Sequence, residues 1–160
     1  MQSVALSTGA GKSFIGCALA HAAIRRGHTA LYLRTPRLLA DLALSRGDGR
    51  YVRRLAALAK IGVLVLDDFI VTPPSIIEAK DLLEVIDDRS QVRSTLVISQ
   101  LPVESWHSSL AAGDLTLADA ILDRLIHDAD RLALKGGSMR RRQPPEEIPE
   151  CVRPDLLALM

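Results

Sequence analysis

The chain has few of the residues that several classes of protein depend on. Aromatic residues make up only 3% of its 160 residues, whereas 48% are hydrophobic, and an aliphatic core is typical of layered α/β or all-α proteins, not of β-sandwiches. Its two cysteines show no paired spacing, which argues against a zinc site or a disulfide framework. No basic segment followed by an apolar core opens the chain, and no apolar run approaches the roughly 18 residues that span a bilayer. We therefore expect a cytoplasmic protein.

Acidic residues are scarce in the first part of the chain. Residues 1–60 hold ten of the twenty basic side chains but only two of the nineteen acidic ones, although the net charge is +1. This excess is compatible with an anionic partner such as nucleic acid, and also with a merely solvated face. Six arginines of the predicted helices and loops in this part carry much of it: Arg34, Arg37, Arg46, Arg50, Arg53 and Arg54.

Apolar runs that alternate with helical patterns predict the fold class. Runs that are apolar throughout are typical of strands buried on both faces. The predicted strands are a stub at 3–6, then 29–33, 61–68, 94–99 and a short last strand at 131–135. Because strands and helices alternate, we predict a three-layer α/β fold with a mostly parallel five-stranded sheet whose first strand is truncated.

Helix-start signals and apolar periodicity place the helices between these strands. Residues 14–24 predict a mostly buried helix. Ser75 and Glu78 form a capping box for a helix whose buried face would include Ile76, and Thr116 would cap a later helix. We expect Trp106 to be a packing anchor.

A few more positions carry expectations that the structure can test. Lys80, Arg89 and Arg93 are predicted to be surface charges. From residue 136 onward the composition changes to glycine, proline and charge. We therefore expect one domain over residues 1–142 and a flexible tail over 143–160.

The stretch STGAGKS, which ends at Ser13, has the residues of a phosphate-binding turn. In such a turn backbone N–H groups point at the phosphates and the following helix adds its positive N-terminal end. Lys12 would reach the β and γ phosphates, and the Ser13 hydroxyl would bind Mg²⁺. Leu6 stands where the pattern has its first glycine, which should weaken binding without excluding it. The predicted nucleotide contacts are Thr8, Gly9, Ala10, Gly11, Lys12, Ser13 and Phe14.

Two adjacent acids close the apolar run VLVLDD. A phosphoryl-transfer ATPase needs one acid for the metal and one for the attacking water. Asp67 would therefore hold Mg²⁺ together with Ser13, and Asp68 would orient the water. An acidic strand end facing solvent is the alternative reading, which the phosphate loop argues against. The two motifs together predict binding of ATP or GTP.

The words GAGKS, LVLDDF, EAKDLLEVIDDR, STLVISQLPVESWH and LADAILDRLIHDADRLALKGGSMRRR together resemble the IstB-like helper ATPases of insertion-sequence transposition. These form a branch of the AAA+ superfamily similar to the DnaC-type helicase loaders. The likeness implies ATP hydrolysis, with Gln100 as sensor of the γ-phosphate and Arg140 as a second sensor. It also implies that Arg124 is an arginine finger for the ATP of an adjacent subunit; the alternative is an ion pair with Asp128 on the same helix.

The resemblance also implies partners. Such helpers assemble through ATP on double-stranded DNA without sequence preference and present it to a cognate transposase, so a homo-oligomer is expected, with Arg46, Arg50, Arg53 and Arg54 near DNA phosphates. Because the family carries a further N-terminal region, this chain is expected to be a shortened copy. Two alternatives are a replicative helicase loader and a remnant that binds nucleotide without hydrolysing it.

Overall fold

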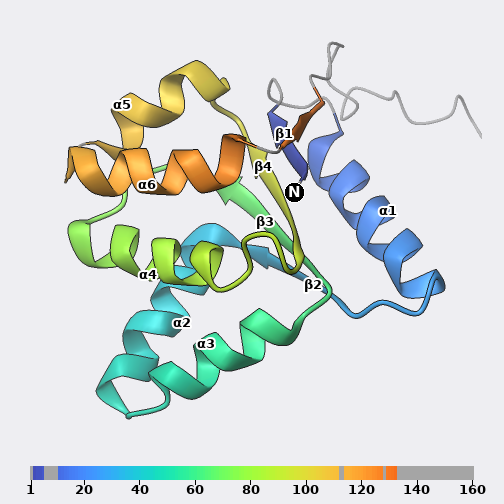
Figure 1. The fold of residues 1–160 in the computed structure, drawn as a ribbon, viewed down its shortest axis with the longest axis horizontal. Coiled ribbons are helices and arrows are strands. Elements are labelled where there is room, and N and C mark those ends of the chain that lie inside the picture. Colours follow the sequence, from blue (N-terminus) through green and yellow to red (C-terminus); the bar gives the residue numbers. More distant parts are fainter. Residues whose placement is uncertain (1, 6–10, 112–113, 128, 133–160) are drawn as a thin grey trace, which may run out of the picture.

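A computed structural model describes residues 2–5, 11–111, 114–127 and 129–132, in which strands and helices alternate along the chain (Figure 1). The strands are β1 (Gln2–Ala5), β2 (Ala30–Arg34), β3 (Val63–Phe69), β4 (Ser94–Ser99) and β5 (Asp130–Arg131). The helices are α1 (Lys12–Arg25), α2 (Thr35–Gly47), α3 (Tyr51–Lys60), α4 (Ile76–Asp87), the 3-10 turn η1 (Val103–Ser105), α5 (Trp106–Leu110) and α6 (Leu115–Ile126).

The strands form one five-stranded sheet in the order β2-β3-β4-β1-β5. Every pairing between them is parallel. The predicted fold class, with a short first strand, is therefore confirmed. The last predicted strand begins at Asp130 as β5, while residues 133–135 lie outside the described ranges. Because all strands run the same way, their carboxyl ends meet along one edge of the sheet, where open α/β proteins bind their ligands.

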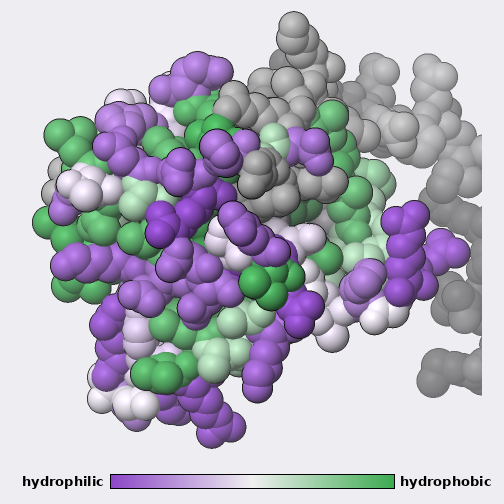
Figure 2. Space-filling model, viewed as in Figure 1, coloured by the Kyte–Doolittle hydropathy of each residue, from purple (hydrophilic) through white to green (hydrophobic). Residues whose placement is uncertain are grey.

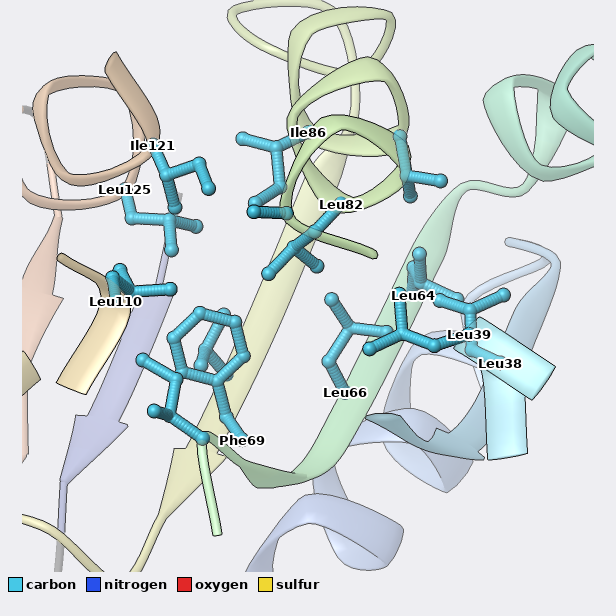
Figure 3. Packing of buried hydrophobic residues seen from close by; sticks show 14 of the residues in the cluster. Leu38, Leu39, Leu64, Leu66, Phe69, Leu82, Ile86, Leu110, Ile121 and Leu125 are labelled. Carbon is cyan, nitrogen blue, oxygen red and sulfur yellow. The ribbon is translucent and has the colours of Figure 1, made fainter. Parts of the chain in front are cut away.

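Helices cover the two faces of the sheet unequally. Of the helices that the structure describes, α1 alone lies on one face, whereas α2, α3, α4, α5 and α6 lie on the other (Figure 1). The main core fills the space under this second layer. Figure 3 shows aliphatic side chains of β3 beside those of α2 and α4, and those of α6 beside those of α4 and α5. Trp106 is fully buried there, tilted against Phe69 with 5.0 Å between ring centroids, and its indole N–H donates to the Leu101 carbonyl. It is a packing anchor, as predicted.

The prediction that α1 is mostly buried is wrong. Its buried residues are Lys12, Gly16 and Ala20, while Phe14 is 71% exposed. Only one narrow side of α1 meets the sheet, and it does so closely, because a Cβ on Gly16 would lie 2.4 Å from the Ile98 side chain. A sequence that is apolar all round predicts burial all round, but no other described element covers the outer side of this helix (Figure 1).

Three local predictions are confirmed or corrected by the contacts. The capping box of Ser75 and Glu78 is present at the start of α4. Ile76, however, is 46% exposed, since it lies in the first turn of α4, outside the helix's buried stripe. At α6 the cap is Asp114 and not Thr116, because the Asp114 carboxylate accepts from the Thr116 and Leu117 N–H groups.

The outer surface is mainly polar on the face that Figure 2 displays, with apolar patches between the charged side chains. Within the described ranges, no helix is long and apolar enough to cross a membrane.

Candidate active site

Several predicted residues converge at the carboxyl edge of the sheet. Helix α1 begins there at Lys12, directly after Gly11, whose φ of 81° is a left-handed conformation that suits glycine. Among the described residues no side chain caps this helix and no acid lies in its first turn, so its N-terminal end keeps its positive character. The Lys12 side chain is buried, and its ammonium donates to the Ser99 carbonyl at the end of β4 over 2.6 Å.

The Asp67 carboxylate lies at the centre of the site. Its Oδ2 accepts from the Ser13 hydroxyl over 2.6 Å and also from the Tyr32 hydroxyl of β2. Its Oδ1 accepts from the Asp68 backbone N–H over 2.7 Å. Although Asp67 is only 6% exposed, its charge is thus balanced by donors from α1, β2 and β3, which fixes the orientation of both oxygens.

Asp68 lies next to Asp67 but in an unusual backbone conformation. Its φ is 53°, and the register between β3 and β4 shifts between Leu66 and Phe69. A bulge of this kind re-aims side chains at the end of a strand, and a left-handed non-glycine residue is strained. The Asp68 carboxylate receives a bond from Arg34 Nε over 2.6 Å, and the Gln100 amide lies 3.5 Å from its other oxygen.

Burial and charge shift the protonation equilibria at this edge. Burial lowers the pKa of the Lys12 ammonium, while the negative charges of Asp67 and Asp68 oppose that shift. Burial and the bond to Asp67 raise the pKa of Tyr32 to about 12. The Tyr32 hydroxyl therefore remains a donor near neutral pH.

The structure brings together the predicted Lys12, Ser13, Asp67, Asp68 and Gln100. Phe14 lies one residue further along α1 with its side chain in solvent. The predicted contacts Thr8, Gly9 and Ala10, the second sensor Arg140, and the tail at 143–160 lie outside the described residues.

Arg124 is not part of this group within its own chain. Its guanidinium pairs with Asp87 of α4 and donates to the Ala120 carbonyl. The pairing with Asp128 that sequence offered as the alternative involves a residue outside the described ranges. Arg124 is about one-third exposed.

The basic residues near α3 divide into two sets. Arg50, Arg53 and Arg54 line a groove between α2 and α3 together with Asp41. Arg46 instead stacks on the Tyr51 ring and pairs with the fully buried Asp81, while its own side chain stays 43% exposed. Of the four arginines that the resemblance placed near DNA phosphates, Arg50, Arg53 and Arg54 therefore line this groove and Arg46 does not.

Sequence reasoning missed two site residues, Tyr32 and Arg34. Both lie in β2, and the register pairs Arg34 with Asp67 across the sheet. Polar groups at alternate positions near the end of an otherwise apolar strand would have indicated them, once the order of β2 beside β3 was known.

The sequence and the fold both have close counterparts among known proteins. Residues 2–146 match the family described as IstB-like ATP binding protein. A putative insertion sequence ATP-binding protein of Sinorhizobium fredii is 50% identical over 136 residues, which are 85% of this chain and 55% of that protein. The chain thus spans about half the length of the relative it matches.

Two solved structures share the fold at lower identity. The DnaI structure has a TM-score of 0.71 at 21% identity and covers 86% of this chain and 72% of its own. The DnaC helicase loader has a TM-score of 0.69 at 19% identity, with coverage of 84% and 77%. The likeness to DnaC-type loaders and the AAA+ type of fold agree with the sequence-based resemblance. On the match over residues 2–146, the chain belongs to the IstB-like ATP-binding protein family.

Proposed function

We propose that this chain binds ATP with Mg²⁺, hydrolyses it, and uses the nucleotide cycle to assemble on DNA as a helper of insertion-sequence transposition. The observation that carries the proposal is the convergence of Lys12 and Ser13 from α1 with Asp67 and Asp68 from β3. These are the groups that phosphoryl transfer requires, held at the edge where parallel sheets bind ligands.

The start of α1 supplies the phosphate contacts. Backbone N–H groups from Gly11 onward and the positive end of the helix attract the phosphates, and Lys12 adds a point charge. Binding requires the Lys12 ammonium to exchange the Ser99 carbonyl for a phosphate oxygen. An anion there offsets the burial that disfavours the charged amine.

The residues present fit a magnesium ion. Ser13 Oγ and Asp67 Oδ2 lie 2.6 Å apart, and both are the hard oxygen ligands that Mg²⁺ prefers. Bound beside the phosphates, the ion would neutralise charge on the γ-phosphate. Asp67 and Ser13 are the residues that would hold it, directly or through water.

Asp68 would accept a proton from the attacking water or orient that water. The nearby Gln100 amide supports its use as a sensor, because it can bridge from Asp68 toward a phosphate. Arg34 holds the Asp68 carboxylate through a mostly exposed side chain, so the contact is easily exchanged with solvent. Arg124 would stabilise developing charge in a neighbouring subunit once it leaves Asp87.

Turnover measurements with two site variants test the enzymatic part. Lys12→Ala should weaken ATP binding by about 10- to 100-fold, since a charge-assisted contact is lost. Asp68→Asn should keep ATP binding but lower turnover by about 100-fold or more. Lys80→Ala, a change to an exposed lysine of α4, should leave both unchanged. A folded parent that shows no turnover, with or without DNA, would favour the non-hydrolysing remnant.

The groove that Arg50, Arg53 and Arg54 line supports the DNA part of the proposal. Contacts from Arg53 and Arg54 to phosphates would be independent of sequence and sensitive to salt. Replacing both by alanine should reduce the slope of log affinity against log salt by about 2. The matched control replaces Arg25 and Arg26, an exposed pair at the end of α1, and should leave the slope unchanged. If both double variants change the slope equally, the groove is not the DNA site.

The choice between transposition and helicase loading rests on relatives. The Sinorhizobium fredii relative, at 50% identity, is named for an insertion sequence, whereas the DnaC loader shares 19% identity and therefore the fold alone. We therefore favour a transposase as partner. Co-purification with a transposase from the same element supports this choice, and co-purification with a replicative helicase instead would overturn it.

A further inference from the structure

Tyr32 makes a contact that the proposed nucleotide cycle does not explain. Its hydroxyl donates to Oδ2 of Asp67, the same oxygen that accepts from the Ser13 hydroxyl. A carboxylate has about four acceptor positions, two on each oxygen. Both positions on Oδ2 are therefore taken, and the Asp68 N–H takes one on Oδ1.

The oxygen that Tyr32 uses is the one that faces the expected metal position. Ser13 Oγ lies 2.6 Å from Oδ2, so a cation held by Ser13 brings its own water ligands to that oxygen. The Ser13 hydroxyl can keep donating to Oδ2 while its oxygen binds the cation. The Tyr32 hydroxyl, by contrast, takes the remaining acceptor position of Oδ2 and competes with the water for it.

The ring of Tyr32 takes no part in this competition between its hydroxyl and the water. It comes from β2, where it packs against the small apolar cluster of Val65, Leu96 and Ile98 under α1. The ring is thus positioned by packing, and only its hydroxyl depends on Asp67. The bond can be given up without unpacking the ring.

We propose that the Tyr32 hydroxyl occupies the acceptor position of Asp67 that a magnesium-bound water needs, so that Tyr32 sets the Mg²⁺ concentration at which nucleotide binds. This inference rests on the proposed binding of magnesium nucleotide. It makes Tyr32 a residue that acts through Asp67, with an effect on the metal step and not on nucleotide binding itself.

Removing one hydroxyl tests the proposal. In Tyr32→Phe, binding of a fluorescent, non-hydrolysable ATP analogue is titrated with Mg²⁺ and compared with binding in EDTA. The Mg²⁺ concentration for half-maximal enhancement should fall by about 3- to 10-fold, as expected for the loss of one competing hydrogen bond. Binding in EDTA should stay unchanged.

The second tyrosine of the chain offers a matched control. Tyr51 also donates its hydroxyl to a carboxylate, that of Asp81 over 2.7 Å, but in the contact of α3 with α4. Tyr51→Phe should leave the Mg²⁺ dependence unchanged. Because the chain has two tyrosines, Tyr32 is the one tyrosine left in this variant. NMR of isotopically labelled tyrosine then reports on Tyr32 without overlap. That signal should shift with magnesium nucleotide and not with nucleotide in EDTA.

The outcomes separate this inference from the function on which it rests. A parent that does not bind the analogue with Mg²⁺ overturns the proposed function and the inference together. A parent that binds, with a half-maximal Mg²⁺ concentration that is equal or higher in Tyr32→Phe, overturns the inference alone. Should Tyr32→Phe fail to fold, the NMR signal decides, and a Tyr32 signal indifferent to magnesium nucleotide overturns the proposal.

Discussion

Arg89 shows how much a single side chain can contribute away from the site. It is fully buried, yet among the residues that the structure describes it bonds no carboxylate. It donates to the carbonyls of Leu58, Ile61 and Ser94 and to the Thr95 hydroxyl. Burial lowers its pKa to about 10, with a smaller contribution from the charge of Arg93. Arg89 thereby satisfies carbonyls at the end of α3 and the start of β4 that water would otherwise have to reach.

Replacing Arg89 tests this role. Arg89→Met removes a buried charge, which is favourable. It also leaves several buried acceptors without a donor, and each of these costs about 1–3 kcal/mol of stability. We expect the second effect to win and the free energy of unfolding to fall by about 2–4 kcal/mol. Arg93→Met, at an exposed arginine on the same loop, should change it by less than about 0.5 kcal/mol. Urea denaturation measures both, and similar values for the two variants would refute the assignment.

The prediction that Arg89 is a surface charge failed for a physical reason. Arginine is almost never fully buried unless it is paired, so its position just after α4 favoured solvent. Its partners are carbonyls, which every residue carries, and the bonds join Leu58 to a residue 31 positions away. No residue type in the sequence marks such partners, whereas the capping box of Ser75 and Glu78 was predictable because both partners are local.

At the scale of elements, strand positions were easier to predict than helix burial. Mainly apolar runs placed β3 and β4 close to their observed bounds, since a strand covered on both faces is mostly apolar. Helix α1 is also largely apolar, but the other described elements cover it on one side only (Figure 1). Composition reports how apolar a helix is, while burial depends on what packs against it.

The start of α6 gives a test at this scale. Asp114 accepts from the Thr116 N–H over 2.8 Å and from the Leu117 N–H over 3.4 Å. Asp114→Ala should therefore lower the free energy of unfolding by about 1 kcal/mol, the usual effect of removing an N-cap. Thr116→Ala, at the position that sequence favoured, should change it by less than about 0.5 kcal/mol. Thermal or urea unfolding of both variants distinguishes the two caps, and a larger loss for Thr116→Ala would reverse the assignment.

At the scale of the whole molecule, the site depends on the parallel sheet. Lys12 and Ser99 are far apart in the chain and meet because the ends of parallel strands share one edge. The motifs predicted Lys12, Ser13, Asp67 and Asp68 together, since their roles in phosphate chemistry imply proximity. They could not predict that β2 lies beside β3 and contributes to the same edge, because strand order is a property of the complete fold.

Arg124 lies outside the site of its own chain, and its predicted role as an arginine finger requires a second chain. Within its chain it pairs with Asp87 on the side of α6 that meets α4, about one-third exposed. A partly exposed ion pair contributes little to stability, so its exchange for a phosphate of a neighbouring subunit costs little. An arginine finger acting in trans predicts that one complete site needs two chains, one supplying Asp68 and the other supplying Arg124.

Mixing two inactive variants tests this prediction. Arg124→Ala keeps an intact nucleotide site but lacks the finger, whereas Asp68→Asn keeps the finger but lacks the acid. If the finger acts in trans, an equal mixture should recover up to about a quarter of the parent's ATP turnover, because that share of interfaces pairs a good site with a good finger. Asp87→Asn, which frees Arg124 without removing it, should retain turnover. A mixture as inactive as its components, although both variants assemble, would place Arg124 outside the neighbouring site.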